Sequence, residues 1–401
     1  MTPIRIPPTL RTETGGAREV QAQGRTVREL LDDLTAQYPG LSGQIYADGD
    51  IAPFLNVYVG GEDVRTLDGL ETAVEDGATV ILLPAMAGGQ RLELSPSLLD
   101  LVGYTPLVEL TRLAPEGVHM YAKLEGQNPT GSIKDRVAKA MIEAAEASGA
   151  LEPGRGLLEP TSGNTGISLA FIAKLKGYSL TCVMPENATE ERKKLLRLYG
   201  ATIIESPAAE GSNGAVRVAL ELAERDPRYY MPFQYGNEAN PRAHYEGTGA
   251  EIADALDRVD VLVAGLGTGG TLMGTGERLR ESFPDLVVAA AEPLPGDPVM
   301  GLRSLEDGYV PPILDVTKLD RKILVSNAES VTGVRALLQR EAIFAGDSSG
   351  AVVHVARKLA EELEEGAVVV CILADGGWKY LSSDFWESED PEAAMERGHW
   401  W

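Results

Sequence analysis

The residues with the clearest chemical potential surround Lys134, in the stretch Asn128-Pro-Thr-Gly-Ser-Ile-Lys-Asp-Arg136. The lysine follows a turn rich in Gly, Pro, Ser and Thr, and residues 137–146 after it predict a helix. A lysine near a helix N-terminus faces the positive end of the helix dipole, which disfavours its charged form, and partial burial would disfavour it further. A neutral amine can form a Schiff base with a carbonyl cofactor. The alternative is an ordinary solvated lysine in a first helical turn, and the rest of the chain decides between them.

A second motif, Thr161-Ser-Gly-Asn-Thr-Gly166, lies between a predicted strand at 157–159 and a predicted helix at 167–176. Glycines expose backbone N–H groups there, and hydroxyl groups share the same turn, so the loop can bind a carboxylate at a helix N-terminus. A plain Ser/Thr/Asn helix cap has the same composition and is the alternative interpretation.

A third motif, Gly267-Thr-Gly-Gly-Thr271, follows a predicted strand at 259–264 and indicates a phosphate cradle by the same reasoning. Gly265, Gly267 and Gly270 also fit the G-x-G-x-x-G pattern, and Glu292 lies at about the distance expected for a ribose-binding acid. A dinucleotide-binding site is therefore an open alternative.

The elements that must position these motifs alternate between strand and helix, which indicates a parallel α/β fold, here with two sheets. Buried-type strands are predicted at 120–125, 157–159, 180–184, 202–204, 259–264, 286–291 and 367–373. Helices are predicted at 137–146, 167–176, 189–199 and 213–224.

The first 89 residues have a different pattern. Strands at 2–6 and 18–22 precede a helix at 26–34, whose Thr26 and Glu29 have the spacing of a capping box, and strands at 54–59 and 79–83 follow. This order predicts an α+β roll with one helix across a sheet. The segment ends at Gly88-Gly89, where two residues without side chains make a thin, flexible tail.

This first segment resembles the ubiquitin-related β-grasp sulfur-carrier proteins, which end in Gly-Gly. In that family the terminal carboxylate is adenylated and converted to a thiocarboxylate. Gly89 is followed here by Gln90, so it has no free carboxylate. A protease cuts after Gly89, or the domain is a tethered docking or regulatory module, or the two parts were joined by design. A flexible Gly-Gly linker is the plainer alternative.

Beyond a joining segment at 90–97, the motifs taken in order resemble the cysteine synthase family, fold-type II enzymes that use pyridoxal 5'-phosphate. The resemblance runs from about Leu98 to the C-terminus and implies a homodimer. It also implies that Lys134 forms the Schiff base and removes the substrate Cα proton. It implies the following further contacts: Gly267, Thr268, Gly269, Gly270 and Thr271 with the phosphate, Ser348 with the pyridine nitrogen, Asn164 with the cofactor O3', and Thr161, Ser162, Asn164 and Thr165 with the substrate carboxylate.

The implied reaction is β-replacement. Elimination from a β-substituted serine gives an aminoacrylate, and sulfur then adds to give cysteine. A serine at the pyridine nitrogen makes the ring a weaker electron sink than a carboxylate would, which suits elimination. Arg303 occupies the place of an arginine in the branch that uses O-phosphoserine, and a guanidinium suits a phosphate leaving group. With a carrier domain in the same chain, O-phosphoserine is favoured over O-acetylserine, and a sulfur-carrier thiocarboxylate over free sulfide. A serine or threonine deaminase of the same fold type stays open.

Bulk properties limit the partners and the location. The net charge of -24 argues against nucleic acid and anionic membranes. Cys182 and Cys371 lie in apolar runs and by spacing form neither a disulfide framework nor a metal site. The N-terminus has no apolar signal segment and no stretch is long enough to span a bilayer, so we expect a cytoplasmic enzyme. The acidic tail at 384–401 ends in Trp400-Trp401, and we consider the hypothesis that it shields the aminoacrylate from water.

Overall fold

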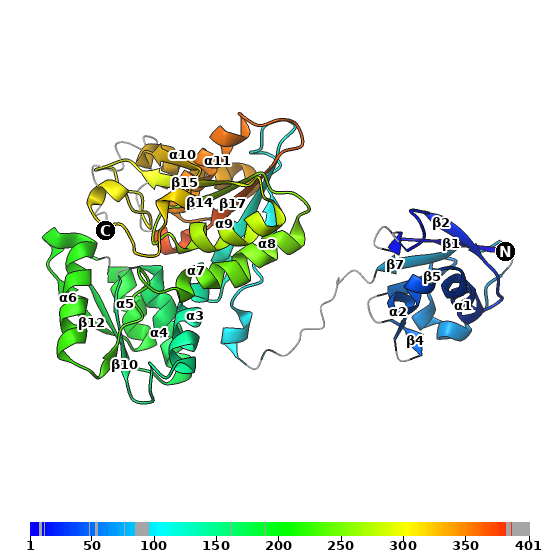
Figure 1. Ribbon diagram of the computed structural model, residues 1–401, viewed down its shortest axis with the longest axis horizontal. Helices are drawn as coiled ribbons and strands as arrows, with labels where there is room; N and C mark the ends of the chain where they lie inside the picture. The colour runs from blue at the N-terminus through cyan, green and yellow to red at the C-terminus, as the bar shows by residue number, and fades with distance from the viewer. Residues whose placement is uncertain are drawn as a thin grey trace. The chain divides into compact units, whose positions relative to one another are not determined.

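A computed structural model describes residues 1–381 except 8, 9, 12, 48, 53, 54, 76, 85–94, 96, 162 and 189, together with Trp386; of residues 84, 191 and 307 it describes the backbone alone. The chain divides into two compact units, Met1–Leu94 and Ser95–Trp401 (Figure 1). Gly88, Gly89, most of the joining segment 90–97 and all of the tail 384–401 except Trp386 lie outside the described residues. The predicted domain boundaries therefore stay predictions.

The first unit is the expected mixed sheet crossed by one helix. Strand β1 pairs antiparallel with β2 and parallel with β7, and β5 pairs antiparallel with both β7 and β6. The sheet order is β2-β1-β7-β5-β6, built from β1 (Thr2–Arg5), β2 (Glu19–Ala22), β5 (Leu55–Val59), β6 (Glu62–Asp63) and β7 (Val80–Pro84). A small two-stranded ladder joins β3 (Tyr46–Ala47) to β4 (Asp50–Ile51), after the short helix α2 (Ser42–Ile45).

Helix α1 (Val27–Gln37) packs on this sheet because its apolar residues fall on one face (Figure 1). Its buried side chains are Val27, Leu30, Leu31 and Leu34. The predicted N-cap is confirmed, since Thr26 Oγ1 accepts a hydrogen bond from Glu29 N at 3.3 Å. The reciprocal half of the capping box is shifted by one residue: Glu29 Oε2 accepts from Arg25 N, at 2.7 Å.

The second unit contains the two predicted parallel sheets. The smaller has the order β12-β11-β10-β13 and is parallel throughout, with β10 (Gly156–Pro160), β11 (Leu180–Pro185), β12 (Thr202–Ser206) and β13 (Tyr229–Tyr230). The larger has the order β16-β15-β14-β17-β9-β8 and is parallel except for its edge pair β8–β9. Its strands are β8 (Leu107–Glu109), β9 (His119–Leu124), β14 (Val261–Gly265), β15 (Val287–Pro293), β16 (Arg321–Val325) and β17 (Val368–Leu373).

Helices cover both sheets, and the four predicted ones are present as α3 (Lys134–Ala147), α4 (Asn164–Lys176), α5 (Glu190–Tyr199) and α6 (Gly211–Arg225). The sequence reasoning did not anticipate α7 (Ala239–Ala243), a π-helical turn at His244–Gly249 and α8 (Ala250–Ala255). It also did not anticipate α9 (Gly270–Ser282), α10 (Asn327–Glu341) or α11 (Asp347–Ala360).

The inner strands β10, β11, β14, β15 and β17 are buried on both faces, as expected where helices cover a parallel sheet, whereas the edge strands β8, β12 and β16 are partly exposed. Cys182 in β11 and Cys371 in β17 are fully buried free thiols, which confirms their interpretation as strand residues. Burial raises the pKa of both thiols, that of Cys371 to about 12.

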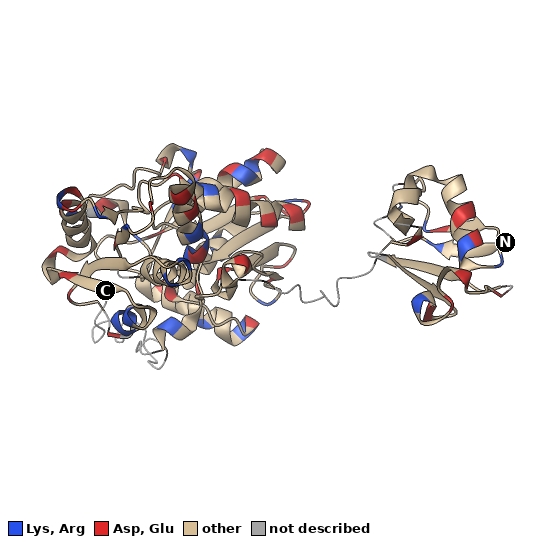
Figure 2. Cartoon of the chain, turned by 90° about the horizontal axis from the view of Figure 1, so that it is seen from below, with Lys and Arg blue, Asp and Glu red and all other residues tan. Residues whose placement is uncertain are grey.

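Charged residues of both signs are mixed over the helices of the second unit (Figure 2). The acidic excess is therefore distributed, as the sequence indicated. Within the described part of the chain, no helix is both long and apolar enough to cross a membrane.

Candidate active site

Lys134 is the first residue of α3 and lines a cavity at the carboxyl ends of β14 and β17. The turn before it is fixed by backbone hydrogen bonds, including Ile133 N to Ala374 O at 2.8 Å, so the lysine is tied to the segment that follows β17. Burial lowers the pKa of the Lys134 amine to about 8, against the opposing charge of Asp375. About a tenth of the amine is therefore neutral at pH 7 and about half at pH 8, and the neutral form is the nucleophile.

The glycine-rich loop connects β14 to α9 at the same cavity. Gly269 has a φ of +89°, and a Cβ there would lie 2.9 Å from the side chain of Leu314, so only glycine fits. Thr268 Oγ1 accepts from Asn240 Nδ2 at 3.1 Å, which leaves its own proton free for an acceptor in the cavity. The first N–H groups of α9 and this hydroxyl make a binding place for a phosphate.

Ser348 lies in the first turn of α11 and lines the cavity with Lys134. Gly301, with a φ of +88°, approaches it, since a Cβ there would lie 3.8 Å from Ser348 Oγ. The neighbouring acid, Asp347, is buried and accepts from Met300 N at 3.0 Å and from Ser330 Oγ at 2.9 Å. The polar group that α11 presents to the cavity is thus a hydroxyl, because Asp347 does not line it.

One cavity brings together residues from five separate parts of the sequence, near 133–134, 264–271, 301–302, 348–352 and 372–374. Those of the predicted site that line it are Lys134, Gly267, Thr268, Gly269, Thr271 and Ser348. The remaining predicted residues with described positions do not line it: Thr161, Asn164, Thr165, Gly270 and Arg303.

The predicted carboxylate loop forms the cap and first turn of α4, so Asn164 and Thr165 are helical and not in an open loop. Thr161 Oγ1 accepts from Gly163 N at 3.3 Å, and Thr165 Oγ1 donates to Gln234 Oε1 at 2.7 Å. Asn164 connects to the cavity through Asp375, which follows the lining residue Ala374. Ser162 lies outside the described residues.

Arg303 lies beside the cavity, held by a backbone bond from its N–H to Leu266 O at 2.7 Å. Its guanidinium carbon lies 5.4 Å from the ring centre of Tyr235 and 5.1 Å from that of Tyr309. Its side-chain hydrogen bond to Asn213 Oδ1 is long, at 3.5 Å. Among the carboxylates whose side chains the structure describes, none lies within salt-bridge distance of it.

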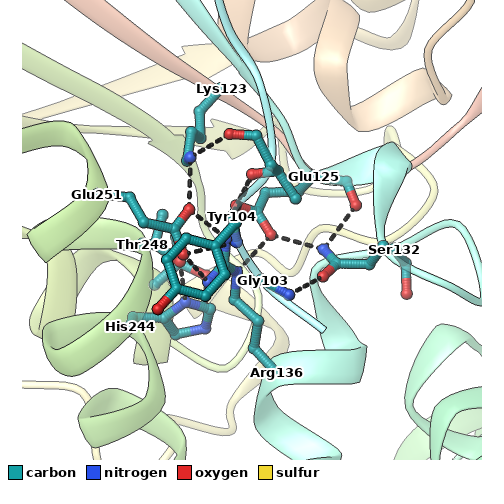
Figure 3. Close-up of polar contacts among 12 residues, drawn as sticks. Gly103, Tyr104, Lys123, Glu125, Ser132, Arg136, His244, Thr248 and Glu251 are labelled. Carbon is teal, nitrogen blue, oxygen red and sulfur yellow. Dashed lines mark hydrogen bonds and ion pairs between the residues drawn. The ribbon is translucent and has the colours of Figure 1, made fainter. Parts of the chain in front are cut away.

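A buried cluster of two acids and two bases lies under the start of α3 (Figure 3). Glu125 accepts from Arg136 Nε at 2.8 Å, and Glu251 accepts from Arg136 Nη1 at 2.6 Å and from Lys123 Nζ. Burial opposes the ionisation of Glu251, but Arg136 and then Lys123 outweigh it and lower its pKa to about 2. The cluster joins the end of β9, the first turn of α3 and α8, and so fixes the helix that carries Lys134.

Several polar residues around the site had no signal in the sequence. His244 is fully buried, with Nδ1 3.1 Å from Thr248 Oγ1 and Nε2 3.3 Å from Thr271 Oγ1. Burial and nearby Lys134 and Arg136 lower its pKa well below the usual value, so the imidazole is neutral. The others are Gln234, Asn240, Asp375 and Lys379. Each lies in a segment without periodic pattern, and only the folded contacts reveal it.

Glu292, the residue expected to bind a ribose in the dinucleotide alternative, makes contacts within the protein instead. Glu292 is buried in β15, where Oε1 accepts from Leu305 N at 2.8 Å and Oε2 lies 3.8 Å from Lys322 Nζ. Its carboxylate is used within the protein, which removes the main support for that alternative.

Comparison with known proteins defines the class. Residues 98–375 match the family described as "Pyridoxal-phosphate dependent enzyme", and residues 4–89 match the ThiS family. The chain belongs to the pyridoxal-phosphate-dependent enzymes, with a ThiS-family domain fused in front.

The similar proteins are of the predicted kind. A "Probable cysteine synthase" of Bacillus subtilis (strain 168) is 45% identical over 300 residues, which is 72% of this chain and 96% of that protein. A cysteine synthase of Staphylococcus aureus (strain Mu50) is 40% identical over 301 residues, covering 73% and 97%. Among solved structures, an O-ureido-L-serine synthase has a TM-score of 0.70 at 38% identity, covering 76% of this chain and 100% of that one. A cysteine synthase of Entamoeba histolytica has a TM-score of 0.70 at 31% identity, covering 78% and 98%.

The residues that line the cavity fit pyridoxal phosphate by their chemistry. Lys134 provides an amine of lowered pKa for the carbonyl, the loop before α9 provides N–H and hydroxyl donors for the phosphate, and Ser348 provides a hydroxyl for the ring nitrogen. A Cβ on Gly269 would lie 2.9 Å from the Leu314 side chain and one on Gly267 would lie 3.3 Å from Gly301 O, so the loop can pass this close to its neighbours only with glycine at these positions.

Proposed function

We propose that this protein makes cysteine by β-replacement on O-phosphoserine, and that its first unit is the sulfur-carrier domain that supplies the sulfur. The similarity to cysteine synthases over nearly their whole length supports the reaction class. In the net reaction, the Cβ–O bond breaks with its electrons leaving on phosphate, a Cβ–S bond forms to the thiocarboxylate sulfur, and water then cleaves the bond between the carrier acyl group and the product, which gives cysteine and the carrier carboxylate.

Arg303 is the single observation that carries the choice of O-phosphoserine. Two aromatic rings hold its guanidinium, and among the described residues no carboxylate neutralises it. Stacking on aromatic faces leaves the N–H donors at the edge of the guanidinium plane available to an anion. A dianionic phosphate gains far more from this cation than a neutral acetyl group does.

The other roles that we propose are those implied by the resemblance to the cysteine synthase family. When bound, pyridoxal phosphate supplies a carbonyl that condenses with amines and a ring that withdraws electrons from the substrate Cα. The neutral Lys134 Nζ would hold the cofactor through its carbonyl, and the same amine would accept the Cα proton of the substrate. Thr161, Asn164 and Thr165, with Ser162 between them, orient the substrate carboxylate at the start of α4. The hydroxyl of Ser348 leaves the ring nitrogen uncharged, which favours elimination.

The experiment compares kcat/KM for O-phosphoserine and O-acetylserine, with sulfide as common donor, in wild type and R303M. We expect a loss of about 100-fold for O-phosphoserine, corresponding to one charge-assisted hydrogen-bonded contact of about 3 kcal/mol, and less than about threefold for O-acetylserine. R225M is the matched control, because Arg225 lies at the end of α6, 77% exposed. Equal losses for both substrates would mean that Arg303 only supports the fold.

A wild-type preference for O-acetylserine would instead favour a free-sulfide enzyme whose first domain docks or regulates without being processed. A deaminase would release pyruvate or 2-oxobutyrate in the presence of sulfide and form no cysteine. The similarity to an O-ureido-L-serine synthase adds an oxygen nucleophile with a ureido group to the nucleophiles to be tested in place of sulfide.

The role of the first unit is tested by the intact mass of the protein from its native host. Two pieces that separate after Gly89 would give a carrier with a usable carboxylate, which an adenylating enzyme would convert to the thiocarboxylate. A single full-length mass would leave Gly89 without sulfur and make the unit a docking module. We also propose a cytoplasmic homodimer, which the mass under native conditions and fractionation would test.

A further inference from the structure

The side-chain amide of Asn164 is held at both ends by one short segment, residues 375–380. Lys379 Nζ donates to Asn164 Oδ1 at 2.6 Å, and Asn164 Nδ2 donates to Asp375 Oδ2 at 2.7 Å. Lys379 lies in the 3-10 turn Gly377–Tyr380, and Tyr380 donates its hydroxyl proton to the same oxygen of Asp375, at 2.6 Å. The segment also touches the lysine turn, because Gly376 N donates to Gly131 O at 3.2 Å.

These two partners permit only one orientation of the amide. An ammonium can only donate, so Lys379 requires the oxygen of Asn164, and a carboxylate accepts, so Asp375 requires the nitrogen. A flipped amide would place N–H against ammonium and oxygen against carboxylate. Nδ2 has two hydrogens and Asp375 takes one, so one N–H remains for a further acceptor.

Stability alone does not explain the position of Lys379. Its only hydrogen bond among the described residues is to a neutral amide, and no carboxylate lies within 4.0 Å of its ammonium there. Burial lowers its pKa, and Asp375 and then Asp135 oppose this shift from a greater distance. The Trp378 ring, with its centre 5.3 Å from Nζ, gives limited compensation. A partly buried ammonium is costly with such partners unless its position serves another purpose.

We propose that Lys379 is a positioning residue of the reaction site: with Asp375, it fixes the Asn164 amide so that one N–H of Nδ2 stays available to the ring hydroxyl oxygen of pyridoxal phosphate. The ammonium also polarises the amide and makes that N–H a stronger donor. The proposal rests on the role of Asn164 at the cofactor and is independent of the choice between O-phosphoserine and O-acetylserine.

The test measures the absorption spectrum of the bound cofactor at fixed pH and its affinity for the apoenzyme, in full-length N164A, K379M, K379R and N164A/K379M. We expect N164A to shift the spectrum and to weaken cofactor binding by about five- to tenfold, the value of one hydrogen bond. K379M should reproduce most of both effects, whereas K379R should keep the spectrum and the affinity of the wild type. The double variant N164A/K379M should behave as N164A does. K318M is the control, because Lys318 pairs with Glu277 on the exposed surface.

The outcomes separate the premises. A spectral change in N164A with none in K379M would overturn the proposal, as would effects that simply add in the double variant. No change in N164A would overturn the premise that Asn164 serves the cofactor, whatever substrate the R303M experiment favours. A lowered melting temperature of K379M with an unchanged spectrum would make Lys379 a structural residue.

Discussion

Arg136 and Glu125 form an ion pair in which the guanidinium Nε lies 2.8 Å from the carboxylate Oε2, with the two side chains 5% and 0% exposed. Arg136 lies two residues after Lys134 in the chain, and its ion pair with Glu125 closes the base of the lysine turn. A buried charge pair of this kind gives specificity of position, because neither partner can move without leaving the other uncompensated.

We therefore expect R136M to destabilise the second unit by about 3–5 kcal/mol, since it leaves the carboxylates of Glu125 and Glu251 facing each other without the guanidinium. Urea unfolding of the full chain, followed by fluorescence, measures this. R225M, which removes an exposed arginine, should change stability by less than about 0.5 kcal/mol. Similar small losses in both variants would show that the cluster relaxes freely.

The lowered pKa of Lys134 predicts a pH dependence of cofactor capture. Only the neutral amine attacks the carbonyl, so with a pKa of about 8 the rate of covalent attachment to the apoenzyme should rise about fivefold from pH 7 to pH 8 and level off near pH 9. An unperturbed lysine would keep gaining about tenfold per pH unit over this range. Stopped-flow absorbance measures the rate. K134A should show no covalent attachment, and K139A, a lysine of the same helix, should behave as wild type.

The sequence predicted the parts of the site that are local. Glycines at 267, 269 and 270, the lysine after its turn and the strand before each motif are all readable from a few neighbouring residues, and the structure places most of them in one cavity. The contacts between different motifs depend on residues that are far apart in the sequence, so the sequence did not predict them. Lys379 and Asp375 meet Asn164 across more than 200 residues of chain, and no pattern in either segment indicates the other.

The missed helices have a physical explanation of their own. Helices α10 and α11 cross closely, so that a Cβ on Gly333 would overlap the backbone of Gly350, and both helices bury small residues on several sides. Such helices lack the single apolar stripe that sequence reasoning seeks. The segment from α7 to α8 contains a π-helical turn with Gly247 and Gly249, which interrupts its period.

The glycine loop offers a matched pair of substitutions. Gly269 and Gly177 both have positive φ, of +89° and +79°, so alanine at either strains the backbone by about 1 kcal/mol. Gly177 only caps α4 and has no atom within 4 Å of a built Cβ, whereas Gly269 faces Leu314 and lines the cavity. G269A should weaken binding of pyridoxal phosphate by tenfold or more, in the order of one lost phosphate contact, while G177A should leave it unchanged. Fluorescence titration of each apoenzyme with pyridoxal phosphate measures this affinity. Equal affinities of G269A and G177A would mean that the phosphate does not bind at the loop before α9.

Asp347 predicts how the second unit responds to pH. Burial raises the pKa of its carboxyl to about 6, with further raising by Asp375 and Asp297, while the bonds from Met300 N and Ser330 oppose the shift. Because the folded-state pKa is raised, the folded protein binds the proton more tightly than the unfolded chain. The stability from this proton is complete below about pH 4 and is lost as the pH rises through about 6, an effect of roughly 3 kcal/mol.

Asp347→Asn removes the titration and keeps an acceptor for Met300 N. Urea unfolding at a series of pH values measures the free energy of unfolding of both proteins. Relative to wild type, that of the variant should rise between about pH 4 and pH 7, and the difference between the two should stay constant above that. Parallel curves for the two proteins over that range would contradict a proton held at Asp347.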